Sequence, residues 1–275
     1  MPTSAKKIID AIEQLAPLSL ATDWDRSGVQ ISVEWGEKRG VLVALDVTEE
    51  TVQEAYHTGM DFLLTHHPLL FSYDIKNGIR DDEPTGALIV KLIENGITVY
   101  AAHTSYDAAP GGMNDALAGA LGLEDAAPLA PDGEAAMVRI GRLPMAMPFD
   151  VATRYVSEKL QLNGKVRTVG DPHELIHTVA ICGGAGGDFM AEAYKAGADL
   201  YITGDVRHHE GILAASMQRC LIDAGHAALE KIFVPAMTEY LRGYFGDDIN
   251  VLEVLDSQAD PDPFRFPYLS EEDED

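Results

Sequence analysis

Apolar runs alternate with helical spacings along this chain and predict an α/β protein. Val41 to Leu45 is an unbroken apolar run, which is typical of a strand buried on both faces. In Lys6 to Leu15 the apolar residues recur every three or four positions, which predicts an amphipathic helix. We therefore expect strands and helices to alternate over most of the 275 residues.

Capping residues and breakers set the boundaries of these elements. Thr48 is a suitable N-cap for a helix that reaches about Tyr56, and Gly59 is a suitable C-cap. The segment 126–131 reads as a connector because it is rich in Ala, Pro and Asp. The other expected strands lie at 61–65, 97–102, 136–141, 166–169, 177–182, 200–203, 219–223 and 250–255, and the other expected helices at 86–94, 114–121, 149–160, 189–195, 211–217 and 224–244.

The stretch from Val41 to Thr65 resembles the stretch from Val179 to Thr203 at a constant offset of 138. Each reads as strand, helix, Gly and strand, and each half continues to a His-x-x-x-acid pattern, at 103–107 and at 226–230. Chance likeness between α/β units is one explanation, and internal duplication is the one we favour. The identical pairs are Val41/Val179, Glu54/Glu192, Ala55/Ala193, Tyr56/Tyr194, Gly59/Gly197, Asp61/Asp199 and Thr65/Thr203.

A duplicated chain predicts two pseudo-symmetric α/β domains with a metal site in the cleft between them. The carboxyl ends of parallel strands are where open α/β folds hold their ligands. We expect a first α/β half at 1–127, a second half at 128–225, a helix and strand that return to the cleft at 226–256, and an acidic, solvated tail at 257–275.

Acidic residues dominate the charge, with 45 Asp and Glu against 20 Lys and Arg and a formal net charge of −25. This balance disfavours direct nucleic-acid binding, because a phosphate backbone would be repelled. It fits a high-salt cytoplasm or ordinary solubility through self-repulsion, and its negative field would help a buried multivalent cation.

The first ten residues lack the apolar stretch of a secretory signal, and no run of about 18 apolar residues could span a membrane. Cys182 and Cys220 have no partner at disulfide or metal spacing. We expect a soluble, cytoplasmic protein.

Candidate chemistry begins with two adjacent histidines, His66 and His67, where an apolar run meets Pro68. Neutral imidazole is the commonest protein metal ligand, and the end of a strand is a place where neighbouring side chains can point to one spot. A pair of exposed loop histidines is the simpler alternative. The rest of the chain favours the metal site.

His226 and Glu230 are four residues apart at the start of a helix, so they share one face. Together with His66, His67 and Asp107 they give three imidazoles and two carboxylates, which suit Zn, Mn, Fe, Co or Ni better than Ca. Five ligands are too many for one catalytic zinc and suit two divalent ions that share a bridging carboxylate.

These motifs resemble the GTP cyclohydrolase 1 type 2 homologue family, also called domain of unknown function 34. They cover nearly the whole chain in order. One departure is Arg26-Ser27, where the family usually has Asn and an apolar residue, and the chain lacks the long central insertion of some members. The matching motifs are Asp23-Trp24-Asp25 with Gly28 and Gln30, Thr65-His66-His67-Pro68, His103-Thr-x-x-Asp107, Cys182 to Gly187, Thr203-Gly204-Asp205 with His209, and Asp223-Ala-Gly-His226-x-x-x-Glu230.

The resemblance implies a ring-like homohexamer with inward-facing sites. It also implies that His67 and Asp107 bind one metal, that His66 and His226 bind the other, and that Glu230 bridges them. His209 matches a family position near the site and is a candidate proton donor.

Two further features stay open. His103 is either a catalytic residue that orients Asp107 or a substrate, or a structural histidine at a strand end. The glycines of 183–187 could cradle a phosphate, but they lack the Lys-Ser/Thr of a P-loop, and a tight strand-to-helix turn is the favoured interpretation.

Two functions follow from this site. The first is a dinuclear metal-dependent hydrolase, either GTP cyclohydrolase-like or phosphoester-cleaving, with a small-molecule and possibly nucleotide substrate. The second is a non-catalytic metal-binding or regulatory scaffold. The two differ in whether metal binding is accompanied by turnover.

Overall fold

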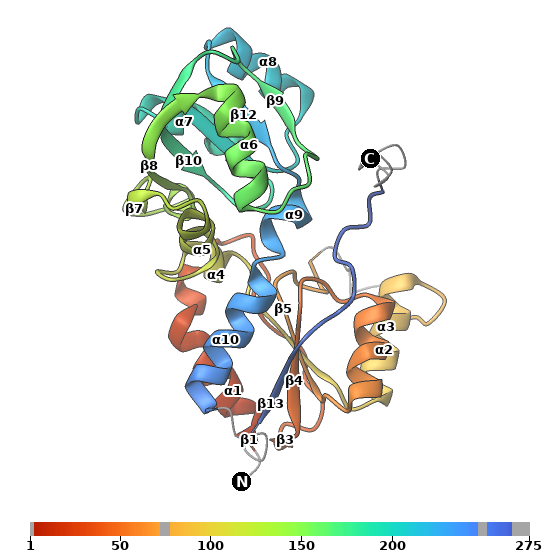
Figure 1. The fold of residues 1–275 in the computed structure, drawn as a ribbon. Coiled ribbons are helices and arrows are strands. Elements are labelled where there is room, and N and C mark those ends of the chain that lie inside the picture. The colour runs from red at the N-terminus through yellow and green to blue at the C-terminus, as the bar shows by residue number, and fades with distance from the viewer. Residues whose placement is uncertain (1–2, 72–77, 247–251, 266–275) are drawn as a thin grey trace, which may run out of the picture.

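The computed structural model describes residues 3–71, 78–246 and 252–265. The chain has a mixed α/β fold with two large sheets, each in a lobe of its own (Figure 1). The end of the predicted acidic tail, 266–275, lies outside the described residues. None of the helices in the described ranges has the length and apolar character that a membrane crossing requires.

The first sheet has five strands in the order β13-β4-β5-β6-β2, of which only β2 is antiparallel to its neighbour. Helices α2 and α3 cover one face, and α1 and α10 cover the other (Figure 1). The strands are β2 (Gly28–Ile31), β4 (Gly40–Ala44), β5 (Phe62–Thr65), β6 (Thr98–Ala101) and β13 (Glu253–Asp256), and the helices are α1 (Ala5–Leu15), α2 (Glu49–Thr58), α3 (Pro84–Glu94) and α10 (Phe233–Phe245).

The second sheet has six strands in the order β7-β8-β10-β11-β12-β9, with β10, β11 and β12 parallel. Its strands are β7 (Glu124–Pro128), β8 (Arg139–Pro148), β9 (Arg167–Val169), β10 (Leu175–Ile181), β11 (Leu200–Thr203) and β12 (Cys220–Asp223), with helices α6 (Phe149–Lys159), α7 (Met190–Lys195) and α8 (His208–Ser216). Short elements complete the chain: β1 (Thr3–Ser4) paired with β3 (Glu37–Lys38), η1 (Leu18–Leu20), α4 (Thr104–Ala108), α5 (Met113–Ala120), η3 (Glu134–Met137), η4 (Gly187–Phe189) and α9 (His226–Glu230).

The sequence repeat coincides with the register of the strands. Val41 of β4 pairs with Phe62 of β5, and Val179 of β10 pairs with Leu200 of β11, so both partners differ by the same 138 residues. In each half a third parallel strand follows, and an antiparallel strand lies beyond it. Duplication as the origin of this likeness stays a prediction.

Local sequence explains why these elements form where they do. The hydroxyl of Thr48 accepts from the backbone of Thr51, whose own hydroxyl accepts from the Thr48 backbone, so α2 begins with a reciprocal cap. Gly59 ends this helix with φ 75°, a left-handed conformation that glycine adopts freely. The buried core is continuous between the lobes, because one apolar cluster includes Val41, Leu117 and Ile202.

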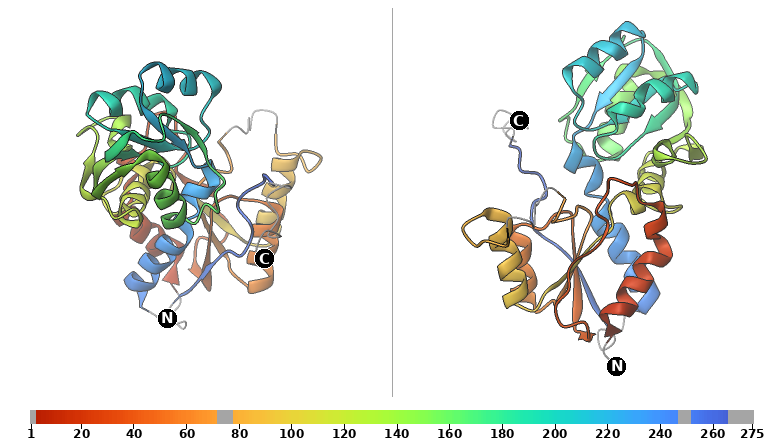
Figure 2. Two further views of the ribbon diagram at one scale, coloured as in Figure 1. Left: turned by 45° about the horizontal axis from the view of Figure 1, so that its top comes forward. Right: turned by 180° about the vertical axis from the view of Figure 1, so that it is seen from behind.

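Three expectations were wrong in detail. The predicted connector at 126–131 is partly strand β7, whose five residues are all exposed and therefore have no apolar signature. The predicted strand at 136–141 begins only at Arg139, after the helical turn η3. The single helix predicted over 224–244 is divided into α9 and α10, and this segment runs from the second lobe down beside α1 (Figure 2).

The sheets also bear on the predicted domains. The second sheet begins at Glu124, so the boundary expected between 127 and 128 falls within β7. The C-terminal strand expected to return to the cleft is β13, which joins the edge of the first sheet beside β4. The division into domains stays a prediction.

Candidate metal centre

The two adjacent histidines follow β5, at the carboxyl end of the first sheet. His66 is fully buried, and its Nδ1 donates to the backbone oxygen of Ala102 at 2.9 Å. Since a carbonyl oxygen can only accept, Nε2 of a neutral His66 carries a lone pair. Within the described part of the chain this Nε2 has no hydrogen-bond partner. The exposed loop pair that the sequence left open is therefore excluded for His66.

His67 and His226 face each other from the two halves of the chain. Each Nδ1 contacts a carboxylate, Asp46 at 2.9 Å for His67 and Asp205 at 2.8 Å for His226. The two Nε2 atoms are 3.2 Å apart, and each lies 3.0 Å from Oε2 of Glu230. The contacts of Oε2 lack hydrogen-bond geometry. When both imidazoles are neutral, three acceptor atoms converge on one point, which is what a cation requires.

Asp107 and the other oxygen of Glu230 both lie near His66. Nε2 of His66 is 3.6 Å from Oδ1 of Asp107 and 3.6 Å from Oε1 of Glu230. Oδ1 of Asp107 is also buried and has no hydrogen-bond partner among the residues that the structure describes. Helix α4 carries Asp107 into the cleft, and its backbone oxygen accepts from the side chain of Asn114.

The donor atoms therefore form two groups that share one carboxylate. His67 and His226 lie at one oxygen of Glu230, and His66 and Asp107 lie at the other. This differs from the pairing that the family resemblance implies, because His67 lies beside His226 and not beside Asp107. Nitrogen and oxygen donors in this mixture fit Zn, Mn, Fe, Co or Ni.

Electrostatics point the same way. Burial lowers the pKa of His66 to about 4. Burial opposes charge on His67 and His226 too, but adjacent carboxylates outweigh it and raise the pKa to about 10 and about 9. Burial favours the neutral form of Glu230, but three imidazoles outweigh it and hold its pKa well below the ordinary value. The cluster therefore favours positive charge beside Glu230, either as protons on the imidazoles or as metal ions.

Asp107 differs from Glu230 in this respect. Its burial, and then the nearby charge of Glu230, raise the pKa of Asp107 well above its ordinary value. Both carboxylates face Nε2 of His66 and repel each other, and a cation beside them would reduce that repulsion.

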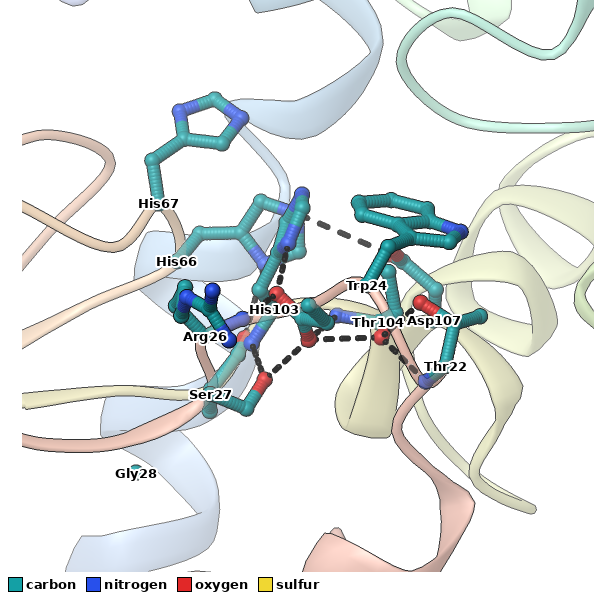
Figure 3. Close-up of polar contacts among 12 residues, drawn as sticks. Thr22, Trp24, Arg26, Ser27, Gly28, His66, His67, His103, Thr104 and Asp107 are labelled. Carbon is teal, nitrogen blue, oxygen red and sulfur yellow. Dashed lines mark hydrogen bonds and ion pairs between the residues drawn. The ribbon is translucent and has the colours of Figure 1, made fainter. Parts of the chain in front are cut away.

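His103 stands beside these ligands and is fixed by the turn before β2 (Figure 3). Its Nδ1 donates to Asp25 at 2.7 Å, and its backbone N–H donates to the hydroxyl of Ser27. Asp25 also accepts from Thr104, through both the backbone N–H and the hydroxyl. This leaves Nε2 of His103 as the ring atom that is available to a bound molecule.

A cavity of about 510 Å³ opens onto this cluster between the two lobes. Trp24, Phe71 and His103 line it from the first half, and Gly183, Gly184 and Ala185 line it from the second. The glycine-rich segment is a turn between β10 and η4. Gly184 has φ +61°, and a Cβ at this position would lie 2.4 Å from Oε1 of Glu230, so the turn allows close approach to the ligands.

His209 is the predicted site residue that lies away from the cluster of histidines and acids. It is exposed at the start of α8, where its ring contacts His208. His209 does not line the cavity within a single chain, so its proton-donor role stays a prediction.

Sequence reasoning missed the residues that orient the ligands. Asp46 follows β4 closely and Asp205 follows β11 closely, and Asp25 lies in the turn before β2. An acid just after a buried parallel strand is the signal that could have identified the first two. Asp25 and Asp205 also stand in the family motifs, which assigned neither of them a role.

Comparisons with known proteins identify the family of this chain and agree with its fold. The family model for Duf34/NIF3 (NGG1p interacting factor 3) matches residues 3–263. A GTP cyclohydrolase 1 type 2 homolog of Clostridium acetobutylicum is 33% identical over 270 residues, covering 97% of this chain and 100% of the relative. A crystal structure of a Bacillus cereus protein related to NIF3 has a TM-score of 0.89 at 27% identity, over 96% of this chain and 99% of the other.

A homolog from Bacillus subtilis with the same name is 27% identical over 371 residues, and the match covers 96% of this chain and 98% of the relative. That span exceeds the 275 residues here, so this relative contains an insertion that the present chain lacks.

The family model covers nearly the whole chain, and the Clostridium acetobutylicum relative is 33% identical over its full length. The chain therefore belongs to the Duf34/NIF3 (NGG1p interacting factor 3) family.

Proposed function

We propose that this chain is a hydrolase that uses two divalent metal ions, held by His66, His67, Asp107, His226 and Glu230. The observation that carries the proposal is the burial of unpartnered acceptor atoms that face one another across Glu230. Leaving such atoms buried without a cation is costly, because each loses its hydration without gaining a partner.

Two divalent ions held in this way supply a nucleophile at neutral pH, by lowering the pKa of water, and stabilise negative charge that develops in the reaction. The chain's own contribution is orientation. Asp46 and Asp205 fix the ring nitrogens of His67 and His226, and such supporting groups typically account for about 10- to 100-fold in metal affinity or activity.

His103 is the residue that we assign to proton transfer. Asp25 holds its Nδ1–H, so Nε2 can take a proton from a reacting group or return one to it. A general acid–base of this kind contributes roughly 10²- to 10⁴-fold to a rate.

The relatives' name, GTP cyclohydrolase 1 type 2 homolog, suggests a purine nucleotide as one substrate, and phosphoesters suit the same centre. The resemblance also implies a homohexamer, which sedimentation of the purified protein would test. A metal-binding scaffold without turnover is the competing function.

One experiment separates these functions. Protein freed of metal by a chelator is reloaded with Zn, Mn, Fe, Co or Ni, its metal content is measured by elemental analysis, and turnover is measured with GTP, nucleosides and phosphoesters. We expect two ions per chain and metal-dependent hydrolysis that is lost in His67→Ala. The control His57→Ala changes an exposed histidine on α2 and should leave both unchanged.

Two ions without turnover on any substrate would favour the scaffold. Failure to retain any of these metals would contradict both functions.

A further inference from the structure

Aromatic side chains form one wall of the cavity above the metal cluster. Trp24, Phe71 and His103 contact one another edge to face, with ring centroids 6.0 to 6.1 Å apart, and we call these three residues the aromatic wall. Trp24 is 49% exposed and Phe71 is 51% exposed, although both line a cavity. Large aromatic surfaces left open in a cavity are suited to stacking against a flat ligand.

The part of the cavity lined by the second half has little side-chain bulk at its glycine-rich turn. Backbone at Gly183 and Gly184 and the small side chain of Ala185 line it there, beside Phe189. The indole Nε1–H of Trp24 donates to Glu134 at 2.7 Å, which fixes the ring plane. The second carboxylate oxygen of Glu134 is then available to accept from a ligand N–H.

The charges around the cavity are unfavourable for a polyphosphate. Among the described residues that line it, none is Lys or Arg. Asp188 lines it too, but Arg207 pairs with Asp188 outside the cavity and also contacts Glu210. Arg26 is exposed and lies on the other side of His103 from Trp24 in Figure 3, and it does not line the cavity.

The carboxylates in and around the cavity carry more negative charge than two divalent ions would neutralise. Two divalent ions carry four positive charges, against six carboxylates, so the region stays negative when both ions are bound. Proteins that bind phosphate groups normally present Arg or Lys side chains to them, and the described residues that line this cavity include neither. The six carboxylates are Asp25, Asp46, Asp107, Glu134, Asp205 and Glu230.

We propose that this cleft takes an uncharged, planar nitrogen heterocycle with N–H donors, of the nucleobase or nucleoside class, and that it discriminates against nucleoside triphosphates. Trp24 stacks on the heterocycle, and Glu134 accepts from its N–H edge. The role of this ligand as substrate rests on the hydrolase proposed above, whereas its binding does not.

The chain provides its own reporter for this binding. It has two tryptophans, Trp24 in the cavity and Trp35 outside it, so Trp35→Phe leaves Trp24 as the sole source of indole fluorescence. In metal-loaded Trp35→Phe, we expect guanosine to quench this fluorescence saturably and to bind at least tenfold more tightly than GTP at low ionic strength. Tighter binding of GTP than of guanosine would overturn the proposal.

A pair of matched variants tests the stacking. Trp24→Ala should weaken guanosine binding by about tenfold in calorimetry, as expected for loss of one base-stacking contact. Trp35→Ala removes a tryptophan of similar exposure, 45%, and should leave the affinity unchanged. Equal affinities in the two variants, with metal content and melting temperature both retained, would contradict the assigned stacking.

Glu134→Gln tests the polar edge. Glutamine keeps an acceptor for Trp24 but removes a charge, so the preference for guanosine over GTP should narrow by several-fold. An unchanged preference would contradict the role of Glu134. Absence of turnover on every substrate would contradict the proposed hydrolase but would not affect these binding affinities. Turnover without guanosine binding would contradict only the proposed ligand class.

Discussion

Strands β5 and β11 occupy equivalent positions in their sheets, and each ends with a threonine at the cleft. In the first half Thr65 is followed by His66 and His67, and in the second half Thr203 is followed by Gly204 and Asp205. One strand end therefore delivers two imidazoles. The other delivers no imidazole but a carboxylate that orients His226.

Packing explains why the second strand end could not repeat the first. A Cβ at residue 204 would lie 2.7 Å from the backbone N of His226 and 2.8 Å from the carbonyl carbon of Gly225. The segment that leads into α9 occupies the space that a side chain would need. The two strand ends, which are alike in register, therefore differ: candidate ligands follow β5, whereas a glycine that leaves space for the segment before α9 follows β11.

The largest expected effect comes from the acids that end the two His-x-x-x-acid patterns. Glu230→Gln removes the carboxylate shared by both groups of donors, so we expect both ions to be lost on gel filtration. Asp107→Asn removes a donor from one group only, so one ion should remain with His67 and His226. Elemental analysis after gel filtration distinguishes the two. Equal metal content in these variants would contradict a bridging Glu230.

The next effect tests the steric difference between the strand ends. Gly204→Ala places a methyl group against backbone, and we expect it to lower the free energy of unfolding by about 3 kcal/mol. Gly119→Ala is the matched control, because a Cβ there would have no described residue outside its own helix within 4 Å. In helix α5 that change should stabilise by about 0.5–1 kcal/mol. Urea unfolding measures both, and a harmless Gly204→Ala would refute the packing argument.

A smaller effect concerns the supporting carboxylates, one from each half. Asp46 and Asp205 each contact the Nδ1 of one histidine, and the two histidines face the same oxygen of Glu230. We therefore expect Asp46→Asn and Asp205→Asn to weaken metal binding alike, by about 10- to 100-fold. Competition with a coloured chelator measures this. If either variant binds metal as tightly as the unaltered protein, the substituted carboxylate does not support the metal centre.

This comparison also shows what sequence alone could reach. Elements with their own signature were predictable, such as the apolar run of β4 and the helix between Thr48 and Gly59. The repeat predicted equivalent strands, because the spacing of apolar residues and the Gly positions are the same in both halves even where the other side chains differ. Strand β7 was not predictable, since an edge strand with five exposed residues has no alternation to detect.

Ligand types were easier to predict than their partners. His and acid residues after strands are visible in a sequence, so the five donors could be proposed. Which donors share an ion depends on ring directions, and the resemblance implied a pairing that the distances between His67, His226 and Glu230 do not support. The short helix α4, which presents Asp107, has too few residues to show a helical period.

The smallest effect contrasts the antiparallel strands β2 and β9, which lie beside the third parallel strand of each half. Asp25, before β2, is 1% exposed and is held by His103, Ser27 and Thr104. Arg167, on β9, is 72% exposed and pairs with Asp223. We expect Asp25→Asn to cost about 1–2 kcal/mol and Arg167→Ala less than about 1 kcal/mol, because exposed ion pairs contribute little.

The pH dependence of these two variants sharpens the contrast. Burial opposes charge on Asp25, but its hydrogen bonds, first to His103, outweigh burial and hold its pKa well below the ordinary 3.8. A lowered folded-state pKa stabilises the protein above the unfolded-state pKa. The difference between the unaltered protein and Asp25→Asn should therefore be complete above about pH 5 and shrink as the pH falls through 3.8. Urea unfolding in chelator measures it without metal release, and a constant difference across this range would mean that the charge on Asp25 does not stabilise the turn that holds His103.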